Sequence, residues 1–98
     1  MDTLEEIKAE LRRLKPEIES RYPLRLLSIF GSFARGEQTP DSDVDVLAEK
    51  RLERLSLFDV LEAQDRLAKS LGRRVDLRLV TEIKPRILGY ITREAQSL

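Results

Sequence analysis

The chain has 98 residues, of which 41% are hydrophobic and 37% are charged, and its formal net charge is zero. A neutral chain has no long-range attraction to a polyanion, so we expect no direct binding of nucleic acid. Cysteine and histidine are both absent, which excludes disulfides, Cys/His zinc sites and a histidine general base. No stretch is long and apolar enough to span a membrane, and no signal peptide is recognisable. We therefore expect one cytoplasmic domain over residues 1–98 that does not contact membranes.

The first expected element is an amphipathic helix over residues 3–20, which we assign to packing. Thr3 and Glu6 have the spacing of a capping box. Pro16 lies inside the helical pattern, so we expect a kink or a break near it. The apolar residues that recur every three or four positions are Leu4, Ile7, Leu11, Leu14 and Ile18.

A buried strand is predicted over residues 24–30, and a polar turn follows it at Gly31 and Ser32. A strand that ends in Gly-Ser and passes into a helical turn presents backbone N–H groups and a hydroxyl, which are the donors that a phosphate needs. An ordinary turn capped by Ser32 explains the same pattern. Residues 38–41 then form a loop into a second strand, at about residues 43–49.

Two carboxylates alternate with two valines in the second strand. Asp43 and Asp45 share one face and Val44 and Val46 the other, because alternate side chains of a strand point the same way. We expect the valines to face a core. Two carboxylates this close raise each other's pKa, and a divalent cation such as Mg²⁺ relieves their repulsion. The alternative is that they form the solvated face of an edge strand.

Gly-Ser, ten further residues and then Asp-x-Asp resembles the signature of the DNA polymerase β-like nucleotidyltransferase superfamily. Residues 31–36 (GSFARG) and 42–45 (SDVD) are similar to its minimal nucleotidyltransferase branch, which includes the antitoxins paired with HEPN-domain toxins. The likeness is densest over residues 26–48 and extends more loosely through Asp76 to the C-terminus. The phosphate and metal site that it implies would bring Gly31 close to the start of the second strand. We therefore expect the first two strands to be antiparallel neighbours.

After a charged connection over residues 49–55, a second helix is predicted. Ser56 and Asp59 have capping-box spacing at its start, and Gly72 is well placed to end it. A half-buried strand follows over residues 73–80. The apolar stripe of the helix consists of Leu57, Val60, Leu61, Leu67, Ala68 and Leu71.

A strand–helix–strand unit of this length gives two parallel strands, so the third strand should start beside the second. Asp76 then lies near Asp43 and Asp45. The alternative for Asp76 is a surface ion pair with Arg74 or Arg78. A closing helix is expected over residues 85–98, with helical spacing of Ile87, Leu88, Ile91 and Ala95.

These elements predict a small α/β (α+β) domain, in which helices flank a mixed sheet of about three strands. The resemblance implies the nucleotidyltransferase fold. It also implies a metal-dependent enzyme that transfers AMP from ATP to a hydroxyl of a partner protein, with a tyrosine of a HEPN toxin as the leading acceptor. Two Mg²⁺ ions and ATP are the expected cofactor and substrate.

The residues expected to hold the metal ions and to act in catalysis are Asp43, Asp45 and Asp76, with Asp76 also helping to deprotonate the acceptor. The residues expected to bind the nucleotide are Gly31, Ser32, Arg35 and Ser42. For Arg35, a surface ion pair with Glu37 or Asp41 is the alternative.

Two other functions stay open at this point. In the first, the domain is a binding module that masks a partner toxin, and its acidic residues only bind nucleotide or are vestigial. Transfer to a small molecule such as an aminoglycoside is the second possibility, although we expect no second domain that would form an acceptor pocket. Homo- and hetero-oligomers are both compatible with the sequence.

Overall fold

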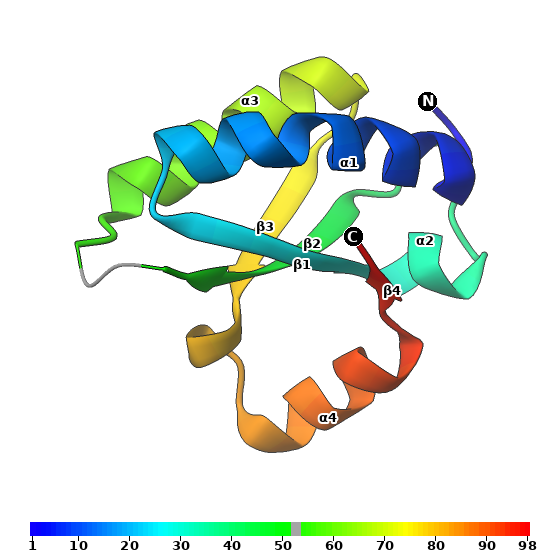
Figure 1. The fold of residues 1–98 in the computed structure, drawn as a ribbon. Coiled ribbons are helices and arrows are strands. Elements are labelled where there is room, and N and C mark those ends of the chain that lie inside the picture. Colours follow the sequence, from blue (N-terminus) through cyan, green and yellow to red (C-terminus); the bar gives the residue numbers. More distant parts are fainter. Residues whose placement is uncertain (52–53) are drawn as a thin grey trace.

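Helices flank a mixed β-sheet in the computed structural model, which describes residues 1–51 and 54–98 (Figure 1). Helices α1 and α3 cover one face of the sheet, and α4 lies on the opposite side. The short helix α2 follows directly from β1. The helices are α1 (Leu4–Arg21), α2 (Gly31–Arg35), α3 (Leu57–Leu71) and α4 (Pro85–Glu94), with a 3-10 turn η1 (Val80–Glu82). The strands are β1 (Leu24–Phe30), β2 (Val44–Lys50), β3 (Val75–Leu79) and β4 (Gln96–Ser97).

The hydrophobic core lies between the sheet and helices α1 and α3. Val44 and Val46 on β2 are fully buried, which confirms that the valines of the Asp-x-Asp segment face the core. The apolar stripe of α1 supplies Ile7, Leu11, Leu14 and Ile18, and α3 supplies Ala63, Leu67 and Leu71.

Helix α1 has the predicted capping box between Thr3 and Glu6, but it isn't broken at Pro16. Proline has no N–H, so the carbonyl of Arg12, four residues earlier, loses its helical partner. Both Arg12 and Pro16 are exposed, so water can bond that carbonyl. The buried stripe on either side of Pro16 then holds the helix on the sheet.

Both predicted strand pairings are confirmed. Strands β1 and β2 are antiparallel, with Phe30 opposite Asp45. Strands β2 and β3 are parallel, with Asp45 opposite Asp76. Helix α3 begins with the capping box of Ser56 and ends at Gly72, whose φ is +68°. Strand β2 continues through residues 49 and 50, and residues 52 and 53 of the expected charged connection lie outside the described residues.

The predicted closing helix ends earlier than expected, and the sheet gains a strand. Helix α4 stops at Glu94, and β4 then pairs antiparallel with β1, with Ser28 opposite Ser97. Over residues 1–51 and 54–98 the sheet therefore has four strands, in the order β3-β2-β1-β4, instead of about three. Strand β4 occupies the edge of β1 that β2 leaves free. Within the described part of the chain, no helix is long and apolar enough to cross a bilayer.

Candidate active site

The three acidic residues singled out from the sequence meet at one end of the sheet. The end of β1 lies beside the start of β2, because the two strands are antiparallel, and β3 starts beside β2, because they are parallel. Asp45 is thus opposite Phe30 on one side and opposite Asp76 on the other. Asp43 directly precedes β2. The strand topology alone brings these residues together.

Gly31 is in direct contact with Asp45. Its φ is +76°, in the left-handed region that glycine tolerates and other residues rarely adopt. A Cβ atom at this position would lie 2.1 Å from Asp45 Oδ2. A side chain at position 31 would therefore displace the carboxylate, so the close approach of β2 to the turn after β1 requires glycine.

The carboxyl group of Asp45 binds its proton more tightly than an ordinary aspartate does. Its pKa is raised from 3.8 to about 6, mainly by burial and then by the negative charges of Asp76 and Asp43. Arg78 and Arg35 lower the pKa, but they don't cancel these effects. A nearby cation would therefore stabilise the ionised carboxylate of Asp45.

Asp43 and Asp76 are each paired with an arginine of β3 or of the turn before it. Arg78 Nε donates to both carboxylate oxygens of Asp76, at 3.1 and 3.0 Å, so the surface ion pair considered for Asp76 does form. Arg74 pairs with a different acid, since its Nε lies 2.9 Å from Asp43 Oδ1. The arginines offset part of the repulsion within the acidic cluster.

The donor set suits a magnesium ion, although the side chains do not converge on one. Asp43 Oδ1 is buried and accepts no hydrogen bond in the described part of the chain, because the nearby Arg74 N–H is not directed at it. Carboxylate oxygens are the ligands that Mg²⁺ prefers. As they stand, no three acidic residues among residues 1–51 and 54–98 are close enough together to hold a metal ion. Asp43 and Asp76 would have to turn away from their arginines to do so.

An open cavity of about 330 Å³ reaches this cluster along the edge of β3. Asp43 and Asp76 line one side of it, and α3 forms the other. At the same edge, Gln64 of α3 accepts a hydrogen bond from the backbone N–H of Leu77 at 3.0 Å. The acids are therefore open to a ligand from this side.

The four residues proposed from the sequence to bind nucleotide have different surroundings. Ser32 is not the cap of α2, because Phe30 takes that position, and its hydroxyl has no hydrogen-bond partner within the described residues. The Ser42 hydroxyl accepts a hydrogen bond from the Thr39 N–H at 2.8 Å, so it shapes the loop before β2. The role expected of Ser42 in nucleotide binding stays a prediction.

Gly31 and Arg35 share a partner that the sequence did not suggest. Glu94, the last residue of α4, accepts a hydrogen bond from the Gly31 N–H at 3.1 Å. Arg35 donates to both oxygens of Glu94 at 3.2 Å and to Glu37 at 2.5 Å, so the ion pair with Glu37 does form. Nothing local marks Glu94, because it lies 63 positions after Gly31.

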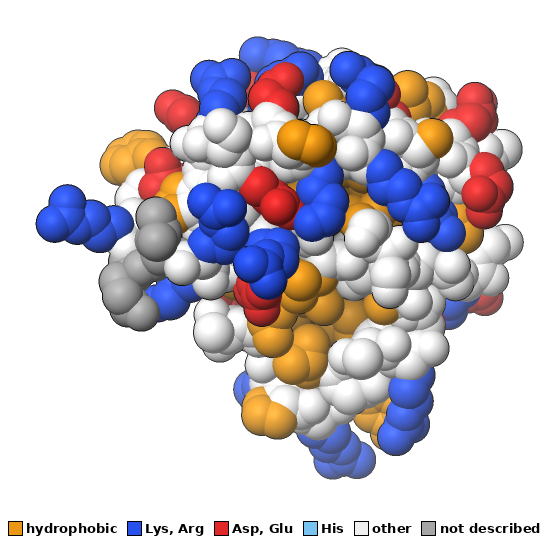
Figure 2. All heavy atoms as spheres, viewed as in Figure 1, with side chains coloured by type: hydrophobic (Ala, Val, Ile, Leu, Met, Phe, Trp, Pro, Cys, Tyr) orange, Lys and Arg blue, Asp and Glu red, His pale blue; other side chains and the backbone are white. Residues whose placement is uncertain are grey.

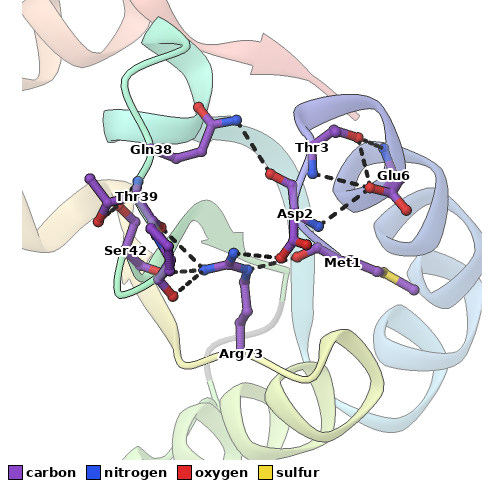
Figure 3. A network of polar contacts seen from close by, with 9 residues as sticks. Met1, Asp2, Thr3, Glu6, Gln38, Thr39, Ser42 and Arg73 are labelled. Atoms are coloured by element: carbon purple, nitrogen blue, oxygen red, sulfur yellow. Dashed lines mark hydrogen bonds and ion pairs between the residues drawn. The ribbon is translucent and has the colours of Figure 1, made fainter.

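Arg73 organises the loop that leads into Asp43, a role that no sequence pattern marks (Figure 3). Its guanidinium group donates to the carbonyl oxygens of Thr39, Pro40 and Ser42, at 3.5, 3.1 and 3.2 Å. Only 10% of its side chain is exposed, and it lies 5.0 Å from the ring centre of Phe33 in α2.

The same guanidinium group holds the N-terminus of the chain. It donates to the carbonyl of Met1 at 2.7 Å and to the carboxylate of Asp2 at 2.9 Å (Figure 3). Arg73 thus connects α2, the loop after it, the start of β3 and the N-terminal residues around one cation. This network fixes the path of the backbone into the acidic cluster.

Comparison with known proteins gives consistent matches over nearly the whole chain. Residues 11–98 match the model of the nucleotidyltransferase domain family. The chain is 40% identical to protein adenylyltransferase MntA of Thermococcus cleftensis over 94 residues, which cover 96% of this chain and 94% of that relative.

Two solved structures have the same architecture. One, described as a minimal nucleotidyltransferase, is 33% identical and superimposes with a TM-score of 0.81, covering 98% of this chain and 96% of that one. The other is the complex of a tri-AMPylated Shewanella oneidensis HEPN toxin with its MNT antitoxin, with a TM-score of 0.69 and 17% identity. That match covers 97% of this chain and 71% of the other, and at this identity it shows the fold alone.

Proposed function

Because the chain belongs to the nucleotidyltransferase family, we propose that it transfers AMP from ATP to a hydroxyl group of a partner protein. One observation carries this proposal: the turn after β1 touches Asp45, and Asp45 is opposite Asp76. A phosphate held at that turn would lie against carboxylates able to hold a metal ion. Nucleotidyl transfer requires this juxtaposition of phosphate and metal ligands.

We assign Asp43, Asp45 and Asp76 to the metal ions. Bound Mg²⁺ would neutralise the triphosphate and the charge that develops on the attacking and leaving oxygens. Asp43 Oδ1, which accepts no hydrogen bond within the described residues, and the raised pKa of Asp45 both favour a cation at this place. Release of Asp43 from Arg74 and of Asp76 from Arg78 would accompany its binding.

We assign the nucleotide phosphates to the turn after β1. The Gly31 N–H, the hydroxyl of Ser32 and the guanidinium group of Arg35 lie on the short helix α2 and are donors suited to phosphate oxygens. Ser42 would act less directly, through the loop conformation that it shares with Thr39.

The transfer itself would be a single displacement at the α-phosphorus of ATP. The acceptor hydroxyl oxygen forms the new P–O bond, and pyrophosphate leaves with the electron pair of the broken bond. Asp76 would accept the hydroxyl proton. Asp76 is suited to this role because it borders the open cavity, whereas Asp45 lies deeper in the cluster.

The acceptor we propose is a protein of the HEPN class, with this chain as the antitoxin of the pair. The related chain from Thermococcus cleftensis is named as a protein adenylyltransferase, and the structurally similar complex contains an AMPylated HEPN toxin. Since the reaction uses ATP, we place it in the cytoplasm. An antitoxin that only masks its partner is the competing function, and the ion pairs of Asp43 with Arg74 and of Asp76 with Arg78 favour it.

The test compares the parent protein with Asp76→Asn. Each is incubated with Mg·ATP and the HEPN-type protein encoded beside it, and the partner is weighed by intact mass spectrometry. We expect AMP adducts with the parent protein and, with Asp76→Asn, a rate lower by about 100-fold or more. Asp76→Asn should still bind Mg·ATP, because Asp43 and Asp45 remain.

The matched control is Glu5→Gln, which neutralises an exposed acid of α1 that is not among the residues assigned to the site. It should modify the partner at the parental rate. If the partner is neutralised equally by the parent and by Asp76→Asn and carries no adduct, the chain acts by masking and the transferase proposal is wrong.

A further inference from the structure

The carboxylate of Glu94 occupies the donors that the proposed function assigns to ATP. It accepts one hydrogen bond from the Gly31 N–H at 3.1 Å and two from Arg35, both at 3.2 Å. A carboxylate is an anion with planar oxygen acceptors, and it binds a backbone N–H and a guanidinium group as a phosphate does. Glu94 thus stands where a phosphate oxygen would be expected.

We propose that Glu94 competes with the phosphates of the nucleotide for Gly31 and Arg35, and so sets the affinity of the domain for ATP. This inference rests on the proposed function, in which those two groups bind phosphate. Binding of ATP would displace the Glu94 side chain from both donors. Loss of Glu94 would leave the donors free and strengthen nucleotide binding.

The tail of the chain places Glu94 opposite Gly31. Directly after Glu94, β4 pairs with the edge of β1, with Gln96 opposite Ile29. The N–H of Leu98 also donates to the Leu27 carbonyl at 3.0 Å. These bonds fasten the end of α4 beside the end of β1, where α2 begins (Figure 1). The strand that the sequence did not reveal thereby determines what faces the phosphate donors.

Helix α4 itself contributes little to the core, so a change at its end would not disturb the rest of the fold. It has no buried residue, and Ile87 and Tyr90 are 51% and 60% exposed. Hydrophobic side chains remain visible on the surface between the sheet and α4 (Figure 2). The Glu94 side chain can therefore leave its partners without opening the core.

Two acidic residues, Glu37 and Glu94, pair with Arg35, and they differ in how far they would compete with a phosphate. Glu37 also pairs with Arg35, but its side chain is 63% exposed. Glu94 is 27% exposed and in addition bonds the Gly31 N–H. Only Glu94 blocks both donors, so Glu37 offers a matched control with the same charge and the same arginine.

The experiment measures the affinity of Glu94→Gln, Glu94→Ala and Glu37→Gln for Mg·ATP by calorimetry. If Glu94 occupies the donors in about 80–95% of molecules, its removal should tighten Mg·ATP by about five- to twentyfold. Glu94→Ala should have the larger effect, because glutamine keeps an oxygen that can accept from Gly31. Glu37→Gln should bind within about twofold of the parent, because it leaves the contact with Gly31 in place.

Ligands that contain only the phosphates or only the nucleoside test whether Glu94 acts at the phosphate donors. Tripolyphosphate with Mg²⁺ should also bind more tightly to Glu94→Ala, and adenosine should bind no better. Equal or weaker binding of Mg·ATP to both Glu94 variants would overturn the inference, because Glu94 would then support the donors instead of competing for them. An equal gain for adenosine would also overturn it, since the effect would not lie at the phosphates.

The amide resonance of Gly31, measured without nucleotide, separates this inference from the proposed function. It should shift in Glu94→Ala and not in Glu37→Gln if the contact exists in solution. If it shifts but neither the parent nor any variant binds Mg·ATP, the proposed function fails and the competition fails with it. If the parent binds Mg·ATP and the Gly31 amide does not sense Glu94, only the competition is wrong.

Discussion

Asp45 and Asp76 occupy opposed positions on the parallel strands β2 and β3, and this pairing determines the electrostatics of the site. Opposed residues on neighbouring strands lie close to each other, so the two negative charges repel. Burial is the main cause that raises the pKa of Asp45 to about 6, and the negative charges of Asp76 and Asp43 add to it. Repulsion between these acids lowers the stability of the ligand-free protein, as is common for residues that serve function.

The first prediction concerns the pH dependence of stability without metal. Because the pKa of Asp45 is higher in the folded protein than the usual 3.8, the folded state binds its proton more tightly. The stability that this adds is fully present below the usual pKa and is lost as the pH rises through about 6. In excess chelator, the melting temperature should therefore fall between about pH 5 and about pH 7.

Asp45→Asn should remove that fall and melt higher than the parent at pH 7. Glu10, whose pKa is lowered to about 2 by Arg13 and Ser70, cannot produce the same slope. The stability that Glu10 contributes is fully present above its usual pKa and is lost only as the pH falls toward about 2. A melting temperature of Asp45→Asn that still falls over this pH range would contradict the assignment.

The second prediction concerns Gly31. Gly31→Ala should destabilise the protein by about 3 kcal/mol or more, because a left-handed backbone and displacement of the Asp45 carboxylate both oppose it. Gly36→Ala is the control, since Gly36 has a φ of +71° and no atom within 4 Å of an added Cβ. It should cost only about 1–2 kcal/mol, the backbone part alone. Urea denaturation measures both, and equal losses would show that the contact with Asp45 is unimportant.

The third prediction concerns Arg73. Arg73→Met removes a nearly buried cation that binds three loop carbonyls, so it should lower the free energy of unfolding by about 2–4 kcal/mol. The free energy of unfolding of Arg73→Lys should lie between those of the parent and Arg73→Met. An ammonium group has fewer donors than a guanidinium group and cannot bind as many acceptors at once.

Arg25→Met is the matched control for Arg73. Arg25 pairs with Glu49 at 3.3 Å on the surface, and 55% of its side chain is exposed. Its replacement should change the free energy of unfolding by no more than about 0.5 kcal/mol. Comparable losses for the two arginines in chemical denaturation would mean that the loop network adds nothing to an ordinary surface ion pair.

The fourth prediction concerns the metal ligands. Replacing Asp43 and Asp45 together by Asn preserves shape and removes the charge that Mg²⁺ requires, so the affinity for Mg·ATP should fall by at least about tenfold. Asp41→Asn, in the exposed loop before the cluster, should leave the affinity unchanged. Calorimetry that finds parental affinity in the double variant would rule out this site.

Local patterns in the sequence determined most of the regular structure. The capping boxes at Thr3 and Ser56 and the glycine at position 72 mark helix ends through bonds between residues at most four apart. Helically spaced apolar residues identified the buried side of α1. The stripe predicted for the second helix was partly wrong, because Leu57 and Leu61 are 71% and 48% exposed and α3 buries Ala63 instead. The order strand, helix, strand required a parallel pair, and this was enough to bring Asp76 to Asp45.

Contacts between distant parts of the chain were decided only by the tertiary structure. Strand β4 has two residues and no apolar pattern, and it forms because one edge of β1 is free. The partners of Glu94 and Arg73 lie dozens of positions away, where no spacing rule applies. Pro16 stays in a helix because packing on both sides of it outweighs one lost hydrogen bond. Residue types and local spacing indicated the three acidic residues of the site. The packing of the whole chain determined which charged side chains lie beside the site.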